Sequence, residues 1–219
     1  LANSLQIAFG AFGFGLAIGL FGAYGKLYGG VVTRDLLAIY TTVIRAVPEL
    51  VLILILYYIG TDLINQASRA MGYGRVEISG VVAGIWVLGI VQGAYATEVL
   101  RGAIQAVPSG QIEAARAFGM PSFMLMRRIT IPAMMSFATP GLANLWLIAT
   151  KDTALLAIVG FSELTLETRQ AAASTRAYFT FFLAAGALYL IVTLLSGVIF
   201  AWIEKWARRG QPSLRGSSK

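Results

Sequence analysis

The residues that could carry out chemistry in this chain are few. It contains no His and no Cys, and charged residues make up only 12% of its 219 positions. His is the commonest general base and metal ligand, and Cys supplies thiolate nucleophiles and redox sites. The carboxylates that remain are not clustered as acid–base catalysis requires. We therefore expect no enzyme activity, no metal site and no cofactor bound by this chain.

A nucleotide site is not expected either. Gly25-Lys26 resembles the end of a phosphate-binding loop, but Leu20 and Leu27 stand where that loop needs Gly and Ser or Thr. Any ATP that drives this protein must then be hydrolysed on a separate subunit.

Polar side chains within apolar stretches indicate binding rather than catalysis. Gln92 and Tyr95 are three residues apart and share a helix face, and an amide at membrane depth needs a partner in the protein interior. Structural roles stay open, since Asn144 could cap a helix break and Trp146 could lie in an interfacial aromatic belt. Lys151 and its neighbour could likewise form a structural ion pair. We predict a polar pathway lined by Gln92, Tyr95, Asn144, Trp146, Lys151 and Asp152.

Two charged pairs follow helical spacing. Glu98 and Arg101 are three residues apart, which predicts an ion pair that fixes the end of their helix. Arg45 and Glu49 are four apart and could either line the pathway or anchor their helix at an interface. The anchoring interpretation is the favoured one.

Membrane helices must position these side chains. Hydrophobic residues make up 58% of the chain and its mean hydropathy is +0.75, which is too apolar for a soluble domain of this size. A bilayer core needs about 20 mostly apolar residues per helix. We predict an all-α integral membrane protein with a single transmembrane domain at 1–208 and a basic tail at 209–219. Its five spans lie at about 5–24, 36–60, 80–100, 133–150 and 178–203.

Some of these segments carry expected breaks. Pro48 should kink the second span, and Pro140-Gly141 should break the fourth. The apolar run at 154–161 is too short to span and is expected to be a re-entrant or surface piece.

The first segment is glycine-rich. Gly15 and Gly19 form a small-xxx-small pair, for which packing within the chain is favoured over a dimer contact. The segment is too long for a signal-peptide core, so we expect it to be a retained span. Because the numbering begins at Leu1 rather than Met, we also expect a short segment before it.

The interval 101–132 is the one long polar stretch between spans. Its helix-capping and helix-breaking residues predict a helix–turn–helix, with Ser109 as the first N-cap and Gly119 as the left-handed end of the first helix. Pro121 suits the first turn of the second helix, and Pro132 is expected to end it. Such an element must contact something in the aqueous phase.

The same interval is similar to a known motif. Glu113-Ala114-Ala115, Gly119 and Ile129-Thr130-Ile131-Pro132 resemble the EAA loop of binding-protein-dependent ABC importers, with Ile131 in place of Leu as the departure. Residues 41–49, 93–98 and 151–155 look like the polar amino acid permease subfamily, of which the histidine/lysine-arginine-ornithine and opine permeases are the nearest kind. The resemblance covers about residues 5–205.

This resemblance implies a type I ABC importer permease fold with a cytoplasmic coupling loop. It also implies a permease subunit for polar, basic amino acids or opines that works by alternating access. The implied partners are an ATP-binding subunit dimer that holds ATP and Mg²⁺, a periplasmic amino acid binding protein, and a second permease chain that is similar but different, or else identical. The residues implied in coupling to the ATPase are Glu113, Ala114, Ala115, Phe118, Gly119, Phe123, Met126, Ile129 and Pro132.

The basic residues predict the orientation in the bilayer. If the 101–132 loop is cytoplasmic, twelve of the seventeen Lys and Arg residues lie on that side, as the positive-inside rule requires. Five spans then place the N-terminus in the periplasm and the C-terminus in the cytoplasm of a bacterial inner membrane. The net charge of +7 thus reflects topology rather than nucleic-acid binding.

Two alternatives to the importer interpretation stay open. A secondary amino acid transporter would carry several intramembrane ionisable groups or internal repeats, and neither is evident. A membrane subunit that only docks a partner would use the loop without transporting anything. The sequence leaves undecided which amino acid is carried, whether the two permeases are identical, and whether a specific substrate site lies in this chain.

Overall fold

The computed structural model describes residues 1–208, and every regular element within them is helical. Five apolar segments are long enough to cross a membrane, namely α1, α3, α4, the stretch Ser122–Val159 and α9, which confirms the predicted number. The predicted tail at 209–219 lies outside the described residues. The helices are α1 (Ala2–Tyr28), α2 (Val31–Ala46), α3 (Glu49–Ala70), α4 (Gly80–Gln105), α5 (Ser109–Ala117), α6 (Ser122–Leu125), a π-helical turn (Met126–Thr130), α7 (Ile131–Asp152), a 3₁₀ helix (Thr153–Val159), α8 (Leu164–Thr175) and α9 (Tyr178–Ala207).

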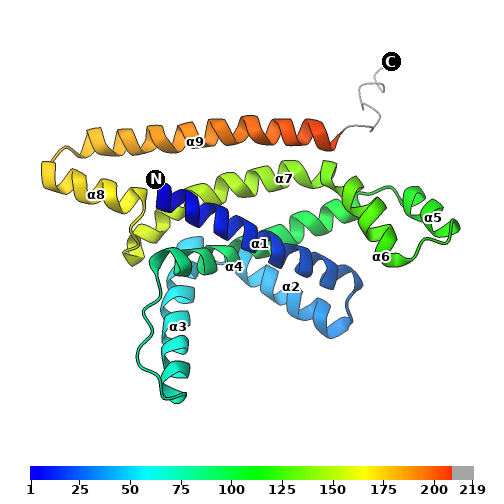
Figure 1. Cartoon of the computed structure of the whole chain (residues 1–219), viewed down its shortest axis with the longest axis horizontal. Coiled ribbons are helices and arrows are strands. Elements are labelled where there is room, and N and C mark those ends of the chain that lie inside the picture. Colours follow the sequence, from blue (N-terminus) through cyan, green and yellow to red (C-terminus); the bar gives the residue numbers. More distant parts are fainter. Residues whose placement is uncertain (209–219) are drawn as a thin grey trace.

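Four of these helices, α1, α4, α7 and α9, lie along the long axis of the molecule, while α3 points away from them (Figure 1). α1 and α4 run in the same direction, because Gly10 lies against Ile85 and Gly22, further along, lies against Thr97. α7 runs antiparallel to α1 and α4, and α9 runs parallel to them. The α5–α6 hairpin and the C-terminal end of α9 therefore share one end of the molecule, and α8 lies at the other (Figure 1).

Glycines hold α1 and α4 close together. A Cβ added at Gly19 would lie 2.9 Å from the carbonyl carbon of Ala96, and one at Gly15 would lie 3.2 Å from the backbone nitrogen of Gly93. Backbone atoms cannot move aside as a flexible side chain can, so only glycine fits at this spacing. The small-xxx-small pair in the first span thus packs within the chain, as predicted.

The predicted second span at 36–60 is wrong in its bounds, because the helix breaks instead of kinking. Val47 takes an extended conformation with φ −94° and ψ 139°, which separates α2 from α3. The residue before a proline is pushed out of the helical region, and here that residue is Val47 before Pro48. The helix resumes at Glu49 and continues to Ala70, ten residues beyond the predicted end.

The predicted break at Pro140-Gly141 is also wrong, since α7 continues through both residues. Gly141 packs closely against Val99 of α4, where an added Cβ would lie 2.7 Å from a Val99 methyl carbon. Directly before Pro140, the Thr139 hydroxyl donates to the carbonyl oxygen of Met135, one turn back, at 2.6 Å. Neighbouring helices and hydroxyl side chains of this kind allow proline inside membrane helices.

Pro132 does not end its helix either. The five residues before Ile131 form the π-helical turn, in which the Ile131 N–H donates to the carbonyl oxygen of Met126. A proline ring would clash with a carbonyl one α-helical turn back, and the wider turn before it is one way to relieve that clash. The chain therefore passes from α6 into α7 without a break.

The apolar run predicted at 154–161 as a re-entrant or surface piece is a buried 3₁₀ turn that continues α7. Leu156 is 0% exposed and packs with Ile7, Ile53 and Val87 from three other helices. The surface alternative is therefore wrong.

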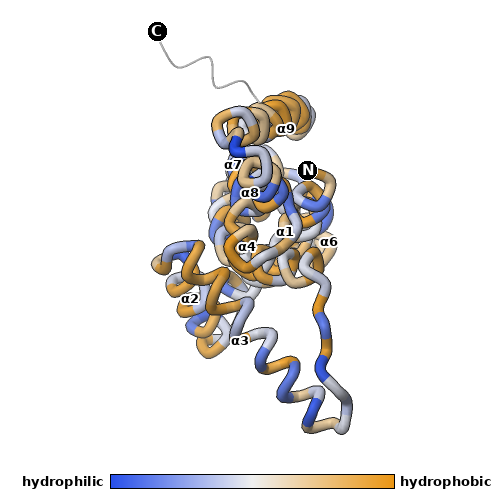
Figure 2. The backbone as a smooth tube through the Cα atoms, turned by 90° about the vertical axis from the view of Figure 1, so that its left-hand side faces the viewer, coloured by the Kyte–Doolittle hydropathy of each residue, from blue (hydrophilic) through white to orange (hydrophobic). Residues whose placement is uncertain are grey.

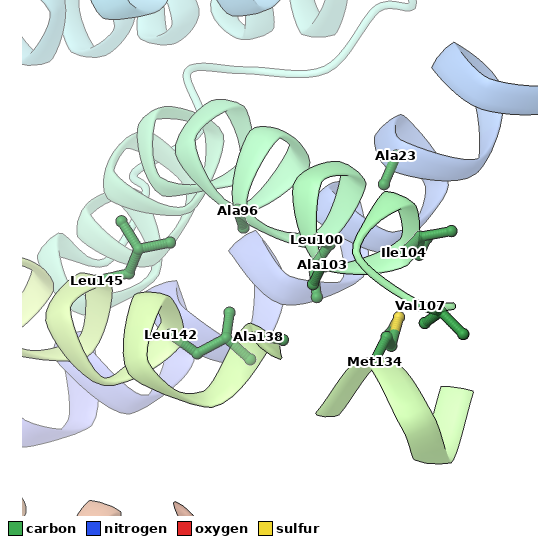
Figure 3. Packing of buried hydrophobic residues seen from close by; sticks show 10 residues of the cluster. All are labelled: Ala23, Ala96, Leu100, Ala103, Ile104, Val107, Met134, Ala138, Leu142 and Leu145. Carbon is green, nitrogen blue, oxygen red and sulfur yellow. The ribbon is translucent and has the colours of Figure 1, made fainter. Parts of the chain in front are cut away.

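The main apolar core lies among α1, α4 and α7. Its centre includes Leu100 and Ile104 of α4 and Met134 and Leu142 of α7 (Figure 3). By contrast, α9 is hydrophobic over nearly its whole length but lies at the edge of the molecule (Figure 2). In the most apolar 18-residue stretch of α9 only 11% of the residues are buried, compared with 61% in that of α4. Such exposed apolar faces suit lipid or another membrane chain.

Candidate functional site

A polar cluster lies inside the helical body, where α4 meets the end of α7. The amide nitrogen of Gln92 donates to a carboxylate oxygen of Asp152 at 3.3 Å, although the two residues are 60 positions apart. Both side chains are buried, with Gln92 2% and Asp152 8% exposed. The carboxylate of Glu49 lies beside Asp152 and also beside the Tyr95 hydroxyl. Two carboxylates, an amide and a phenol thus converge from three helices.

One atom in this cluster has no partner. The Gln92 amide oxygen is buried and, within residues 1–208, accepts no hydrogen bond. A buried acceptor without a donor is unfavourable by about 1–3 kcal/mol. An orphan acceptor beside two carboxylates is complementary to a group that brings hydrogen-bond donors and positive charge.

Glu49 is the cluster residue that the predicted pathway omits. The chain break at Val47–Pro48 starts α3 anew, and Glu49 is its first residue. The favoured pairing with Arg45 is not formed. Among residues 1–208 neither side chain makes an ion pair, and the Arg45 guanidinium carbon instead lies 6.0 Å from the centre of the Tyr95 ring. A carboxylate directly after a helix-breaking proline was the signal available in the sequence.

Trp146 and Asn144 lie outside this cluster, while Lys151 directly precedes Asp152 and its charge acts on the Asp152 carboxylate. Trp146 is buried on a different side of α7, where its indole nitrogen donates to the Ser196 hydroxyl of α9 at 2.8 Å and its ring packs against Phe9 and Phe12. It thus joins α1, α7 and α9 and does not lie in an interfacial belt. Asn144 and Lys151 are exposed. Of the six predicted residues, the structure brings together Gln92, Tyr95 and Asp152.

The second candidate site is the α5–α6 hairpin. Phe118 is 91% exposed and Phe123 is 79% exposed, although both are large apolar side chains. Glu113 and Ala114 are also exposed, and Glu113 makes no ion pair among residues 1–208. Ala115 faces inward, with 7% exposure, and Ile112 packs against the main apolar core, which holds α5 in place. This surface can contact another protein without rearrangement of the hairpin.

The turn of the hairpin has the predicted geometry at Gly119. Its φ is +72°, in the left-handed region, and its N–H donates to the Arg116 carbonyl oxygen at 2.8 Å. Met120 N–H donates to the Ala115 carbonyl oxygen at 3.1 Å, which completes a Schellman end. The predicted N-cap at Ser109 is wrong, because Pro108 takes the cap position and no side chain caps the helix.

The return from the hairpin into α7 is partly buried. Met126 and Ile129 are half-buried, and Pro132 is exposed. Thr130 is 1% exposed, and its hydroxyl has no hydrogen-bond partner within residues 1–208. Across residues 1–208, no group of three or more acidic side chains is close enough together to hold a metal ion.

Comparison with known proteins places the chain in one group of transport proteins. Residues 15–209 match the family described as binding-protein-dependent transport system inner membrane component. The chain is 40% identical to the histidine/lysine/arginine/ornithine transport system permease protein HisQ of Escherichia coli, over 92% of this chain and 89% of that protein. It is also 40% identical to the nopaline transport system permease protein NocQ of Agrobacterium fabrum, over 90% and 84%.

Solved structures show the same fold. The crystal structure of an amino acid ABC transporter with histidines superimposes with a TM-score of 0.77 at 31% identity, covering 94% of this chain and 91% of that one. The MetNI methionine ABC transporter in an inward-facing form also gives a TM-score of 0.77, at 17% identity and 94% coverage of both chains. At that identity the second likeness concerns the fold alone.

Proposed function

Because this chain belongs to the family of binding-protein-dependent transport system inner membrane components, we propose that it carries basic amino acids or opines across the inner membrane. It is a permease subunit of an ABC importer and not an enzyme, and ATP is hydrolysed on a separate subunit. The predicted family and function are thereby confirmed, and the cargo is the proposal.

The observation that supports a basic cargo is the Glu49–Gln92–Asp152 cluster. A guanidinium or ammonium group supplies several N–H donors and a positive charge. Arg45 near Tyr95 and Lys151 beside Asp152 offset part of the negative charge, but the buried Gln92 oxygen still lacks a hydrogen-bond donor, which such a group would supply. Relatives named for lysine, arginine, ornithine and nopaline agree with a cargo whose side chain carries an ammonium or guanidinium group.

The α5–α6 hairpin is the proposed contact with the ATP-binding subunit, which would hold ATP and Mg²⁺. Phe118 and Phe123 would enter an apolar groove of that subunit, as an exposed helix does in a helix-in-groove contact. Glu113 would pair with a cation of the same subunit. Two ATP-binding subunits, a second permease chain and a periplasmic binding protein for amino acids complete the proposed transporter. A different but similar permease partner is the version we favour.

The proposed orientation places the hairpin and the C-terminal end of α9 in the cytoplasm, and the N-terminus and α8 in the periplasm. This orientation agrees with Figure 1, in which the hairpin and the C-terminal end of α9 lie at one end of the molecule and α8 lies at the other. Transport then proceeds by alternating access. Closure of the ATPase pair moves the hairpins, the cluster opens outward to receive cargo from the binding protein, and reopening releases cargo inward.

The test is uptake by the whole transporter reconstituted in vesicles with its binding protein and ATP. We expect loaded binding protein to stimulate ATP hydrolysis, and arginine, lysine or an opine to be taken up.

Asp152→Asn should lower uptake of the cationic cargo while the ATPase stays bound. Glu113→Ala and Gly119→Val should uncouple or release the ATPase, since valine is strained at a φ of +72°. Wild-type behaviour in all three variants would overturn the proposal.

A further inference from the structure

A group of charged side chains lies at the end of the spans that is nearer the hairpin. Glu98 of α4 accepts a hydrogen bond from the Lys26 ammonium of α1 at 2.6 Å through one oxygen, and from the Arg101 guanidinium at 2.7 Å through the other. This confirms the predicted Glu98–Arg101 pair and adds a partner 72 positions away. The Glu98 and Lys26 side chains are only 17% and 14% exposed.

The same network reaches a third helix and the start of the hairpin. The Lys26 ammonium also donates to the hydroxyl of Thr41 in α2 at 2.9 Å, and Thr41 is 2% exposed. Arg101 donates to the side-chain oxygen of Gln105, the last residue of α4, at 2.8 Å. One carboxylate therefore joins α1, α2 and α4 directly before the chain leaves for α5.

α2 connects this network to the polar cluster. Thr41 lies in its second half, and α2 ends at Ala46, three residues before α3 begins with Glu49. Next to Thr41, the Tyr40 hydroxyl donates to the Ile90 carbonyl oxygen of α4, which holds α2 against the body. A displacement of α2 at Thr41 would thus reach Glu49 beside Asp152.

We propose that Glu98 is a positioning residue for coupling, which makes the ends of α1, α2 and α4 move together with the hairpin so that α2 shifts Glu49 in the cargo cluster. The inference rests on the proposed function. Two cations share this one carboxylate, and opening the Lys26–Glu98 contact would leave both charges unpaired at 14% and 17% exposure, which is unfavourable. The network therefore stays closed during movement and transmits it.

The test compares three variants in the complete reconstituted transporter. Glu98→Gln removes the carboxylate that pairs with Lys26 and Arg101. The double variant Lys26→Met with Glu98→Gln also removes one of the two cations that the single variant leaves unpaired. Glu204→Gln is the matched control, because Glu204 pairs with Arg208 at the end of α9, outside this network. For each variant we would measure arginine taken up per ATP hydrolysed, and the thermal midpoint of the complex.

Glu98→Gln should lower uptake per ATP by about tenfold while hydrolysis continues, and Glu204→Gln should leave the ratio unchanged. The double variant should regain thermal stability but keep the low ratio. If uptake per ATP recovers together with stability in the double variant, Glu98 only neutralises charge and the inference is wrong. The inference is also wrong if Glu98→Gln takes up as much arginine per ATP as the wild type. A wild type without binding-protein-dependent arginine uptake would instead overturn the proposed function.

Discussion

Gly15 and Gly19 in α1 are buried against α4, whereas Phe118 and Phe123 in the α5–α6 hairpin are 91% and 79% exposed. The smallest residues therefore fill the interior of the α1–α4 interface, and two of the largest project from the hairpin. Burial of a Phe side chain stabilises by about 1.5–3 kcal/mol, and the chain leaves that stabilisation unused at the hairpin. The interface is completed within this chain, whereas the hairpin leaves its apolar side chains for the proposed contact with the ATP-binding subunit.

Exposure alone does not separate the hairpin from the rest of the molecule. α9 also exposes large apolar side chains such as Phe179 and Val198. The difference is position, because α9 is a candidate span whose exposed side chains meet lipid or another span, whereas Phe118 lies before the candidate span that begins at Ser122. An exposed Phe beyond the spans would meet water, and this favours a protein partner.

The largest expected effect is on the α1–α4 interface. Gly19→Leu places side-chain atoms where a Cβ alone would lie 2.9 Å from the Ala96 carbonyl carbon. Overpacking of this kind costs about 1–3 kcal/mol or more, and the backbone cannot move aside. We expect little folded protein after detergent extraction, as measured by size-exclusion chromatography. Gly197→Leu in α9, where an added Cβ meets nothing within 4 Å, is the control and should fold normally.

The hairpin should respond in the opposite manner. Phe118→Ser removes an exposed apolar side chain, so the thermal midpoint of this chain should stay within a degree or two. Affinity for the ATP-binding subunit should fall by at least about 30-fold, the effect of a binding hot spot worth roughly 2 kcal/mol. Co-purification and titration with that subunit measure the change. A variant that loses stability but keeps its affinity would show that Phe118 serves the fold.

The sequence predicted the hairpin better than it predicted the packing. Gly119 needs only a local rule, because a left-handed residue at a helix end is usually glycine. Pro48 and Pro140 are locally alike, yet one breaks its helix and the other does not, since Gly141 packs against Val99. Likewise Gln92 meets Asp152 through the antiparallel packing of α4 and α7, which no spacing along the chain reveals.

A smaller effect is expected at Trp146, which was predicted for the pathway but lies between helices. Trp146→Phe keeps a ring against Phe9 and Phe12 but loses the N–H donated to Ser196. One lost hydrogen bond corresponds to about 1 kcal/mol, or a few degrees in thermal midpoint. Uptake per folded transporter should not change. Lower uptake at unchanged stability would return Trp146 to the pathway.

The smallest effect is expected where the hairpin joins the core. Thr130 is 1% exposed, and its hydroxyl has no partner within residues 1–208, so the side chain bears the cost of a desolvated polar group. Thr130→Val replaces that hydroxyl with a methyl group of similar size and should raise stability by about 1 kcal/mol. Thermal unfolding in detergent measures the gain, with Thr139→Val as the control. Thr139 is equally buried but donates to Met135, so its replacement should lower stability. A loss at Thr130 of the same size as at Thr139 would mean that the Thr130 hydroxyl has a donor or acceptor in the assembled transporter, and that the interior of this chain extends into the junction with its partner.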